Sequence, residues 1–231
     1  MSKIHPDAEN KKQYDHVRLV SKECISDDDG RCPCALTVWK RSSMSFQGTD
    51  GFTVFDQHGR LVFRVDNYSR KNGSVAGGGG LVLMDGAGNA LLTLKPQMLR
   101  LQTQWNAYSG DQSERRRSSN QSVVFSMRSC SSGLFRNRKG MIAEVFMVGK
   151  QNQTPEYRIE GSFRARDCRI RKASGQVVAK MARKRANTSV LLNSDVFSLF
   201  VQPGFDAELV MAFVIILDRM SSKPFTPLLC S

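Results

Sequence analysis

The segment that most restricts the fold lies near the end of the chain, where residues 209–217 form an uninterrupted apolar run of nine residues. Asp206 and Glu208 precede this run, and acidic residues are favoured at the N-terminus of a helix. A helix that is apolar on every side lies either in a membrane or inside a protein. Because a bilayer-spanning helix needs about 20 residues, we predict a helix over residues 205–218 that the rest of the chain encloses.

The chain before this helix has the pattern of β-strands. Apolar residues alternate with others at Leu36 and Val38 and at Phe52 and Val54, which is the period of a strand with one buried face. Similar short runs follow at 61–65, 81–85, 90–94, 98–105, 122–129, 141–148, 157–165, 168–172, 176–182 and 196–201. About a dozen strands and one enclosed helix predict a mainly β fold, a closed antiparallel β-barrel of about 12 strands around a central hydrophobic C-terminal α-helix. The helix residues expected inside are Leu209, Val210, Met211, Phe213, Val214, Ile215, Ile216 and Leu217.

Three turns favour antiparallel pairing of neighbouring strands. Residues 54–62 and 83–91 each contain a strand, a four-residue turn that ends in glycine and a second strand, and 171–177 is a looser copy. Glycine adopts the positive φ of such a turn without steric cost. Asp56 and Asp85, at the first turn positions, can accept hydrogen bonds from the backbone two residues on. The pattern predicts a meander of hairpins.

The chain of 231 residues is expected to form one barrel domain, 34–231, after a polar leader, 1–33. The leader lacks the apolar core of a signal peptide, and its acidic residues are unlike a transit peptide. Loops are expected at 67–80, 109–122 and 150–156. We expect a cytoplasmic monomer without a transmembrane span, peripheral at the plasma membrane, with the nucleus as a second location.

Four motifs resemble the plant LURP-one-related family: residues 51–56, 59–68, 81–85 and 201–211, which also follow the family's order. The resemblance covers roughly residues 35–230. It implies the fold of the tubby C-terminal domain and the phospholipid scramblases, a barrel around a C-terminal helix. It also implies a link with plant defence, kinship with membrane-tethered transcription regulators, and no established enzymatic activity.

Residues suited to catalysis or cofactor binding do not gather in the sequence. The three histidines are His5 and His16 in the leader and His58 in a turn, and they form no Ser-His-Asp or Cys-His arrangement. The glycines at 77–80 lack the lysine and following helix of a phosphate-binding loop. We therefore expect a non-enzymatic binding or tethering module with no cofactor.

The six cysteines are scattered, which is typical of reduced thiols in a cytosolic protein. Cys24, Cys32 and Cys34 lack the paired spacing of a zinc site, so no metal is expected. Scramblase relatives carry a lipidated Cys-Pro-Cys-type cluster, and the resemblance therefore suggests S-acylation at Cys32 or Cys34. The basic run before Ser118 and Ser119 suits a kinase, whose phosphate would weaken membrane contact.

The charge is strongly basic, with a formal net charge of +13, and such a field favours anionic partners. Between residues 158 and 185 ten cations face only Glu160 and Asp167. Over 157–166 the basic residues alternate with Tyr157, Ile159 and further small or apolar residues, so period two predicts the cations on one outer face. The candidate anion-binding residues are Arg158, Arg164, Arg166, Arg169, Arg171, Lys172, Lys180, Arg183, Lys184 and Arg185.

Such a face can simply keep a barrel soluble, but a solvating face usually mixes both signs. Each cation near an anionic leaflet gains about 1 kcal/mol. We therefore expect an acidic membrane phospholipid, such as a phosphoinositide, or a protein as the partner. The alternative is a nuclear regulator that acts through protein partners. Sequence-specific nucleic-acid binding is not expected, because no recognition motif is present and Trp39 and Trp105 are expected in the core.

Overall fold

The structure, a computed structural model, describes residues 33–40, 51–67, 80–97, 103–109, 122–130, 140–149, 154–187 and 190–221. This part of the chain contains twelve strands and one helix, α3 (Ala207–Ser221). The strands are β1 (Cys34–Lys40), β2 (Phe52–Phe55), β3 (Leu61–Asn67), β4 (Leu81–Asp85), β5 (Ala90–Gln97), β6 (Gln104–Ser109), β7 (Val123–Ser129), β8 (Met141–Met147), β9 (Tyr157–Ser162), β10 (Asp167–Lys172), β11 (Val177–Arg183) and β12 (Val196–Val201).

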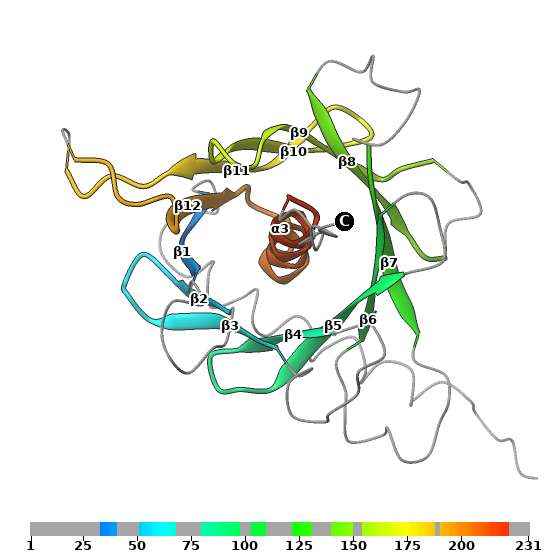
Figure 1. The fold of residues 1–231 in the computed structure, drawn as a ribbon, viewed down its shortest axis with the longest axis horizontal. Helices are drawn as coiled ribbons and strands as arrows, with labels where there is room; N and C mark the ends of the chain where they lie inside the picture. The colour runs from blue at the N-terminus through cyan, green and yellow to red at the C-terminus, as the bar shows by residue number, and fades with distance from the viewer. Residues whose placement is uncertain are drawn as a thin grey trace, which may run out of the picture.

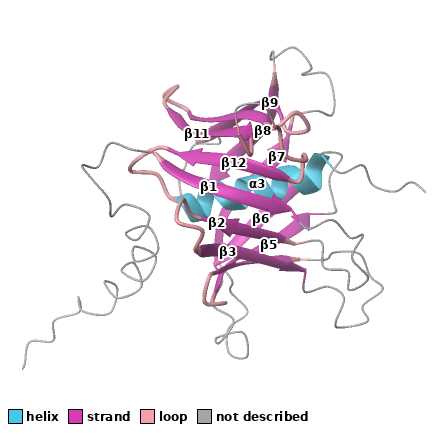
Figure 2. Ribbon diagram, turned by 90° about the vertical axis from the view of Figure 1, so that its left-hand side faces the viewer, coloured by secondary structure: helices cyan, strands magenta, loops and turns pink. Residues whose placement is uncertain are grey.

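The strands form a closed barrel in which each strand pairs with its neighbours in sequence. Every pairing is antiparallel, and β1 closes the barrel against β12, with Cys34 opposite Val201 and Trp39 opposite Val196. Figure 1 looks along the barrel and shows α3 at its centre, and Figure 2 shows the helix running through the ring of strands. The predicted barrel around a central helix is confirmed.

The helix is enclosed because inward-facing apolar residues of the strands meet its whole circumference. Residues 211–216 of α3 have no exposed surface. The ring of Phe213 packs edge-on against Phe125 of β7 at a centroid distance of 4.9 Å, and lies 5.4 Å from the ring of Tyr157 of β9. This burial removes residues 210–217 from water, which is the main stabilising term of such a core. Leu209, also predicted inside, is only partly buried against the core.

The ends of α3 differ slightly from the prediction. Asp206 is the N-cap, because its Oδ1 accepts the backbone N–H groups of Glu208 at 2.8 Å and Leu209 at 3.4 Å. The helix therefore begins at Ala207, and it continues to Ser221 rather than ending at 218. The acidic residues before the apolar run thus mark the helix start.

The predicted glycine turns are present. In the turn between β2 and β3, Gly59 has a φ of 79°, and Asp56 Oδ1 accepts the N–H groups of His58 at 2.8 Å and Arg60 at 2.9 Å. The glycines that end the β4–β5 and β10–β11 turns also have positive φ, 98° at Gly88 and 89° at Gly175. Each turn joins two antiparallel strands, as predicted.

The predicted strand 98–105 can be compared with the structure only in its last residues. Its first part, 98–102, lies outside the described residues, and β6 lies mostly after it. The preceding strand β5 continues through Pro96, beyond the predicted end at 94. Pro96 is tolerated because Leu94 is the last β5 residue paired with β4, so Pro96 has a strand on one side only among the described residues.

Candidate functional site

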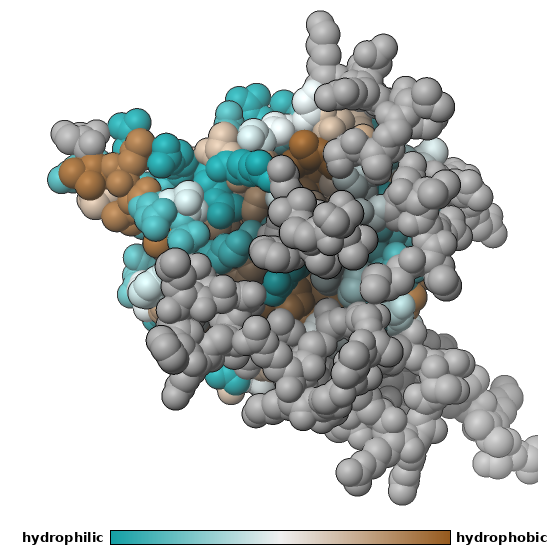
Figure 3. Space-filling view, in the orientation of Figure 1, coloured by the Kyte–Doolittle hydropathy of each residue, from teal (hydrophilic) through white to brown (hydrophobic). Residues whose placement is uncertain are grey.

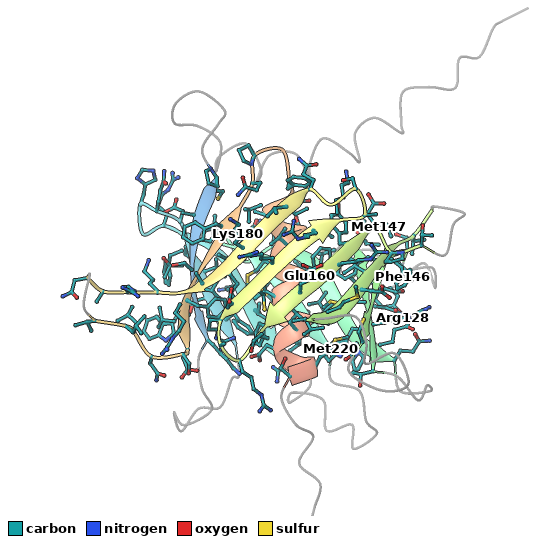
Figure 4. The ribbon with its side chains drawn as sticks, turned by 90° about the horizontal axis from the view of Figure 1, so that it is seen from above. Arg128, Phe146, Met147, Glu160, Lys180 and Met220 are labelled. Carbon is teal, nitrogen blue, oxygen red and sulfur yellow. The ribbon has the colours of Figure 1, made fainter. Side chains whose placement is uncertain are left out.

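The outer surface of three neighbouring strands carries a cluster of cations. Arg158 on β9, Arg169 and Arg171 on β10, and Lys180 on β11 alternate with buried residues and therefore point away from the core. We refer to these four residues as the cationic face. Figure 4 looks onto it and labels Lys180 and Glu160. The structure thus places four of the ten predicted cations on one outer surface.

Two residues of the cationic face are partly neutralised by glutamates. Arg171 Nε lies 3.3 Å from Glu160 Oε2, and its Nη1 also donates to the carbonyl of Gly175 at 3.1 Å. Arg158 Nε lies 3.8 Å from Glu144 Oε1, which is an ion pair but too long for a hydrogen bond. These two arginines therefore present less free charge than the sequence suggested.

Arg169 and Lys180 differ from them. They are direct cross-strand partners of the β10–β11 hairpin, and both are exposed. Among the described residues neither has an ion-pair partner, because the glutamate beside Arg169, Glu160, lies against Arg171 instead. Like charges directly opposite one another destabilise a sheet. An anion bound between these two side chains would remove that repulsion.

The outer surface of β7 and β8 differs from the cationic face. On β7, Arg128 stacks over the ring of Phe146 at 4.7 Å and donates from Nε to Gln104 Oε1 at 3.1 Å. Gln104 in turn donates to Gln97 Oε1 at 2.6 Å. Figure 4 shows Arg128 and Phe146 together, to the side of the strands that carry Lys180 and Glu160. On this side the arginine is thus held by an aromatic ring and by a ladder of amide side chains.

The predicted strand 157–165 is confirmed up to Ser162, but its last three residues are wrong because a turn begins at 163. β9 ends at Ser162, residues 163–166 form the turn, and Ala165 is exposed instead of facing inward. Gly161 has a φ of 107°, and a Cβ atom there would collide with the carbonyl oxygen of Asp167. Only glycine fits this close approach, so Gly161 is what lets the chain turn back.

The same turn buries Arg166, which was predicted on the outer face. Its side chain is 6% exposed, and its guanidinium lies 4.5 Å from the ring centre of Phe163 and 4.4 Å from that of Phe197. Nε donates to the carbonyl of Ser194 at 2.8 Å. Burial lowers the pKa of Arg166, which nearby Asp218 opposes. Arg166 therefore belongs to the core, and its assignment to the anion site is wrong.

Two further predicted cations lie at opposite ends of the barrel. Arg164, in the 163–166 turn, is exposed and donates to the carbonyl of Ser221 at the C-terminal end of α3, at 3.4 Å. Lys172 lies at the other end, with Nζ 5.8 Å from the ring centre of Phe205. Neither side chain joins Arg169 and Lys180.

The last three predicted cations lie where β11 continues beyond the barrel. Arg183 and Arg185 are exposed, and Lys184 Nζ donates to Thr37 Oγ1 at 2.8 Å. Arg185 forms a β-bridge with Leu191, so the chain between β11 and β12 begins as a two-stranded extension. We refer to residues 184–187 and 190–195 as the arm.

The two tryptophans have different environments. Trp105 is 7% exposed and belongs to the core, as predicted. Trp39 is 49% exposed on the outer side of β1, so its predicted place in the core is wrong. The alternation of β1 already contained this result, because Leu36 and Val38 face inward and the residue after Val38 must face outward.

Titratable groups elsewhere give little support for chemistry. Burial raises the pKa of the Cys168 thiol to about 12, which makes it a poor nucleophile. His58 is exposed in a hairpin turn. The part of the chain that the structure describes contains no group of three or more His, Cys, Asp or Glu residues suited to a metal ion.

Several predictions fall on residues outside the described ranges and stay predictions. They are the leader 1–33 up to Cys32, with its histidines and Cys24, and the phosphorylation candidates Ser118 and Ser119. Cys34 is described and is half-buried at the start of β1. Among the helices of the described part, none is long and apolar enough to cross a membrane.

The fold and its outer surface define a class of protein: a closed antiparallel barrel filled by its own C-terminal helix, with exposed cations on one side. The chain belongs to the LURP-one-related family, whose sequence model matches residues 34–218. The resemblance seen in the motifs is thereby confirmed.

Two relatives from Arabidopsis thaliana show the extent of the similarity. The chain is 41% identical to protein LURP-one-related 5 over 188 residues, which cover 80% of this chain and 82% of the relative. It is 35% identical to protein LURP-one-related 12 over 217 residues, which cover 92% and 87%. An X-ray structure of a protein from the same plant matches with a TM-score of 0.56 and 21% identity, over 83% of this chain and 96% of that one, and supports the fold.

Proposed function

We propose that this protein is a non-enzymatic module that binds anionic phospholipid headgroups, such as phosphoinositides, at the cationic face. The observation that carries the proposal is the cross-strand pair of Arg169 and Lys180, which is exposed and has no ion-pair partner among the described residues. Two cations side by side on a rigid hairpin suit a phosphate group, whose oxygens accept several charge-assisted hydrogen bonds.

The magnitude of the attraction supports a peripheral contact. Each cation near an anionic leaflet contributes about 1 kcal/mol, so Arg169 and Lys180 together contribute about 2 kcal/mol. The formal net charge of +13 adds a long-range attraction. The barrel interior, where many barrels hold a ligand, is occupied by α3. Binding on the outside is therefore what this architecture favours.

The setting that we propose is plant defence or stress signalling, which the resemblance to the family implies. The relatives compared above are plant proteins. A nuclear regulator that acts through protein partners would not need two exposed cations side by side on a hairpin. The two functions predict different behaviour toward vesicles, and that difference is the test.

The test is sedimentation with phosphatidylcholine vesicles that contain or lack an acidic lipid, either phosphatidylserine or a phosphoinositide. We expect the wild-type protein to sediment only with the acidic vesicles. The Arg169→Gln, Lys180→Gln variant should bind them about 30-fold more weakly, because it loses about 2 kcal/mol. The matched control is Arg60→Gln, Lys95→Gln, which removes the same charge from exposed residues in the β2–β3 turn and on β5.

The control should bind within about threefold of the wild type, because only the general field changes. Equal weakening of both variants would mean that net charge alone acts and that the cationic face is not the site. Wild-type protein that ignores acidic vesicles and is recovered from nuclei in a protein complex would contradict the proposal and favour the regulator.

A further inference from the structure

The arm between β11 and β12 exposes two apolar side chains, in a molecule whose described residues include few other exposed apolar side chains. Val190 is 50% exposed and Leu191 is 43% exposed. The described part of the chain exposes five large hydrophobic residues, and besides these two they include Trp39 on β1. Trp39 pairs with the first residue of β12, Val196, so it lies close to the base of the arm.

The arm is an ordered ribbon with its own backbone hydrogen bonds. The N–H of Ala186 donates to the carbonyl of Val190, and the N–H of Leu192 donates to that of Lys184, both at 2.9 Å. The side chain of Asn187 accepts the N–H of Val190 at 2.8 Å. These groups are already paired, so moving them out of water costs less than it would for a free loop.

The charge around the arm is mainly positive, and its one acidic residue, Asp195, lies at the end next to β12. Arg183, Lys184 and Arg185 lie at its base, and no acidic residue stands between Asp167 and Asp195 in the sequence. Lys184 binds Thr37 on the outer side of β1, which keeps the base of the arm against the barrel. Apolar side chains beyond a group of cations are the combination that suits the interface of an anionic bilayer.

The geometry joins the arm to the cationic face. β11 carries Lys180 and continues through Arg183 directly into the arm. The residue paired with Val190, Ala186, lies six positions beyond Lys180, which is about 20 Å along an extended strand. Figures 1 and 4 show the arm projecting outward from the ring of strands, and Figure 3 shows brown apolar side chains near its outer end.

We infer that the arm is a membrane-inserting element, whose Val190 and Leu191 enter the headgroup region of an anionic bilayer while the cations at its base contact lipid phosphates. The inference rests on the proposed function and adds to it a second, apolar contact. Electrostatic attraction weakens with salt, whereas apolar insertion does not. Wild-type binding should therefore persist in part at high salt.

The experiment compares two variants of the full chain on vesicles of phosphatidylcholine and phosphatidylserine. Val190→Ser, Leu191→Ser should lose the salt-resistant binding by about tenfold or more, because both side chains leave water on insertion. Leu61→Ser, Val148→Ser is the matched control: it changes the same residue types at exposed positions of other strands and turns. It should bind as the wild type does.

Insertion is read directly with a Trp39→Phe, Val190→Trp variant, since the remaining native indole, Trp105, is buried. Its fluorescence should be quenched by lipids brominated near the headgroup. If the wild type does not bind acidic vesicles, the proposal for the cationic face and the inference about the arm are both wrong. If it binds but the arm variant matches the control and the introduced indole is not quenched, only the arm fails. A dimer that the arm variant abolishes would assign the arm to a second copy and overturn the inference.

Discussion

Both ends of the central helix carry acidic residues, but the environments of these residues differ. At the N-terminal end, Asp206 and Glu208 are partly exposed, and Asp206 accepts two backbone N–H groups of the first turn. At the C-terminal end, Asp218 is 4% exposed and lies where the helix dipole is unfavourable to an anion. Backbone N–H groups of the helix and contact with solvent therefore stabilise the carboxylates at the N-terminal end. Neither is available to the buried Asp218 carboxylate.

The C-terminal end depends on cations from distant parts of the chain. Lys40, the last residue of β1, places Nζ 2.8 Å from Asp218 Oδ1. The buried guanidinium of Arg166 lies close enough for Asp218 to oppose the lowering of its pKa. The helix is thus held to β1 and to the β9–β10 turn. The comparison teaches that ion pairing fixes one end of α3, whereas the other end is only capped.

The largest predicted effect is for a carboxylate placed in the middle of α3, where it would have neither a helix N-terminus nor a cation as a partner. Val214 has no exposed surface. Val214→Asp should abolish folding, because an unpaired buried charge costs several kcal/mol or more, comparable with the whole stability of a domain, about 5–15 kcal/mol. Circular dichroism and thermal melting measure this, with Val148→Asp at an exposed position as the control. A cooperative melt near the wild-type temperature would show that α3 is not enclosed.

An intermediate effect is predicted at the C-terminal end. Lys40→Met removes the hydrogen bond and the charge that Lys40 supplies to the buried Asp218 carboxylate. We expect a loss of about 2 kcal/mol in the free energy of unfolding, below the range for fully buried pairs, because Lys40 is 26% exposed and Arg166 remains. Urea denaturation measures the loss. Adding Asp218→Leu should restore part of it, since a buried pair replaced by apolar residues is often neutral.

The control for this pair is the ion pair between Nε of the exposed Arg60 and Oδ2 of the buried Asp56, at 2.7 Å. Arg60→Met should cost under about 1 kcal/mol, because the Arg60 side chain is 63% exposed. If the Lys40 and Asp218 substitutions instead add without coupling in a double-mutant cycle, the ion pair does not hold the helix.

The comparison also separates what the sequence could predict from what it could not. The apolar run of α3 and the glycine turns act through local patterns, so period and turn chemistry located them. The burial of Arg166 could not be found this way, because its partners are distant in the sequence: Phe197 lies on β12 and Ser194 lies just before that strand. The available signal was Gly161, since glycine inside a strand indicates a bulge or a close backbone approach.

The candidate site was predicted in part for the same reason. Alternation correctly pointed Arg158, Arg169 and Arg171 outward, and Lys180, which was predicted from the run of basic residues, is exposed beside them. It could not show which cations meet glutamates, because that depends on the register between strands. The arm was missed because its residues have no strand periodicity. The adjacent Val190 and Leu191 in a segment without acidic residues were the signal that could have found it.

The smallest predicted effect is at the N-terminal end and depends on pH. Burial, with the nearby carboxylates of Asp206 and Asp85, raises the pKa of Glu208 from 4.5 to about 7. The unfolded chain has the lower pKa, so between pH 4.5 and about pH 7 the folded chain binds more protons than the unfolded chain. The free energy of unfolding therefore falls as the pH rises through this range. Glu208→Gln should remove this decline and be more stable than the wild type at pH 8 by about 1 kcal/mol, after allowance for solvent screening.

Urea denaturation of both proteins across this pH range gives the difference directly. Glu208→Asp keeps a titratable group and should keep a decline with pH. A wild-type and Glu208→Gln pair whose difference does not change with pH would mean that water fully solvates this carboxylate. The N-terminal end of α3 would then be open to solvent, and the contrast with the ion-paired Asp218 would be sharper still.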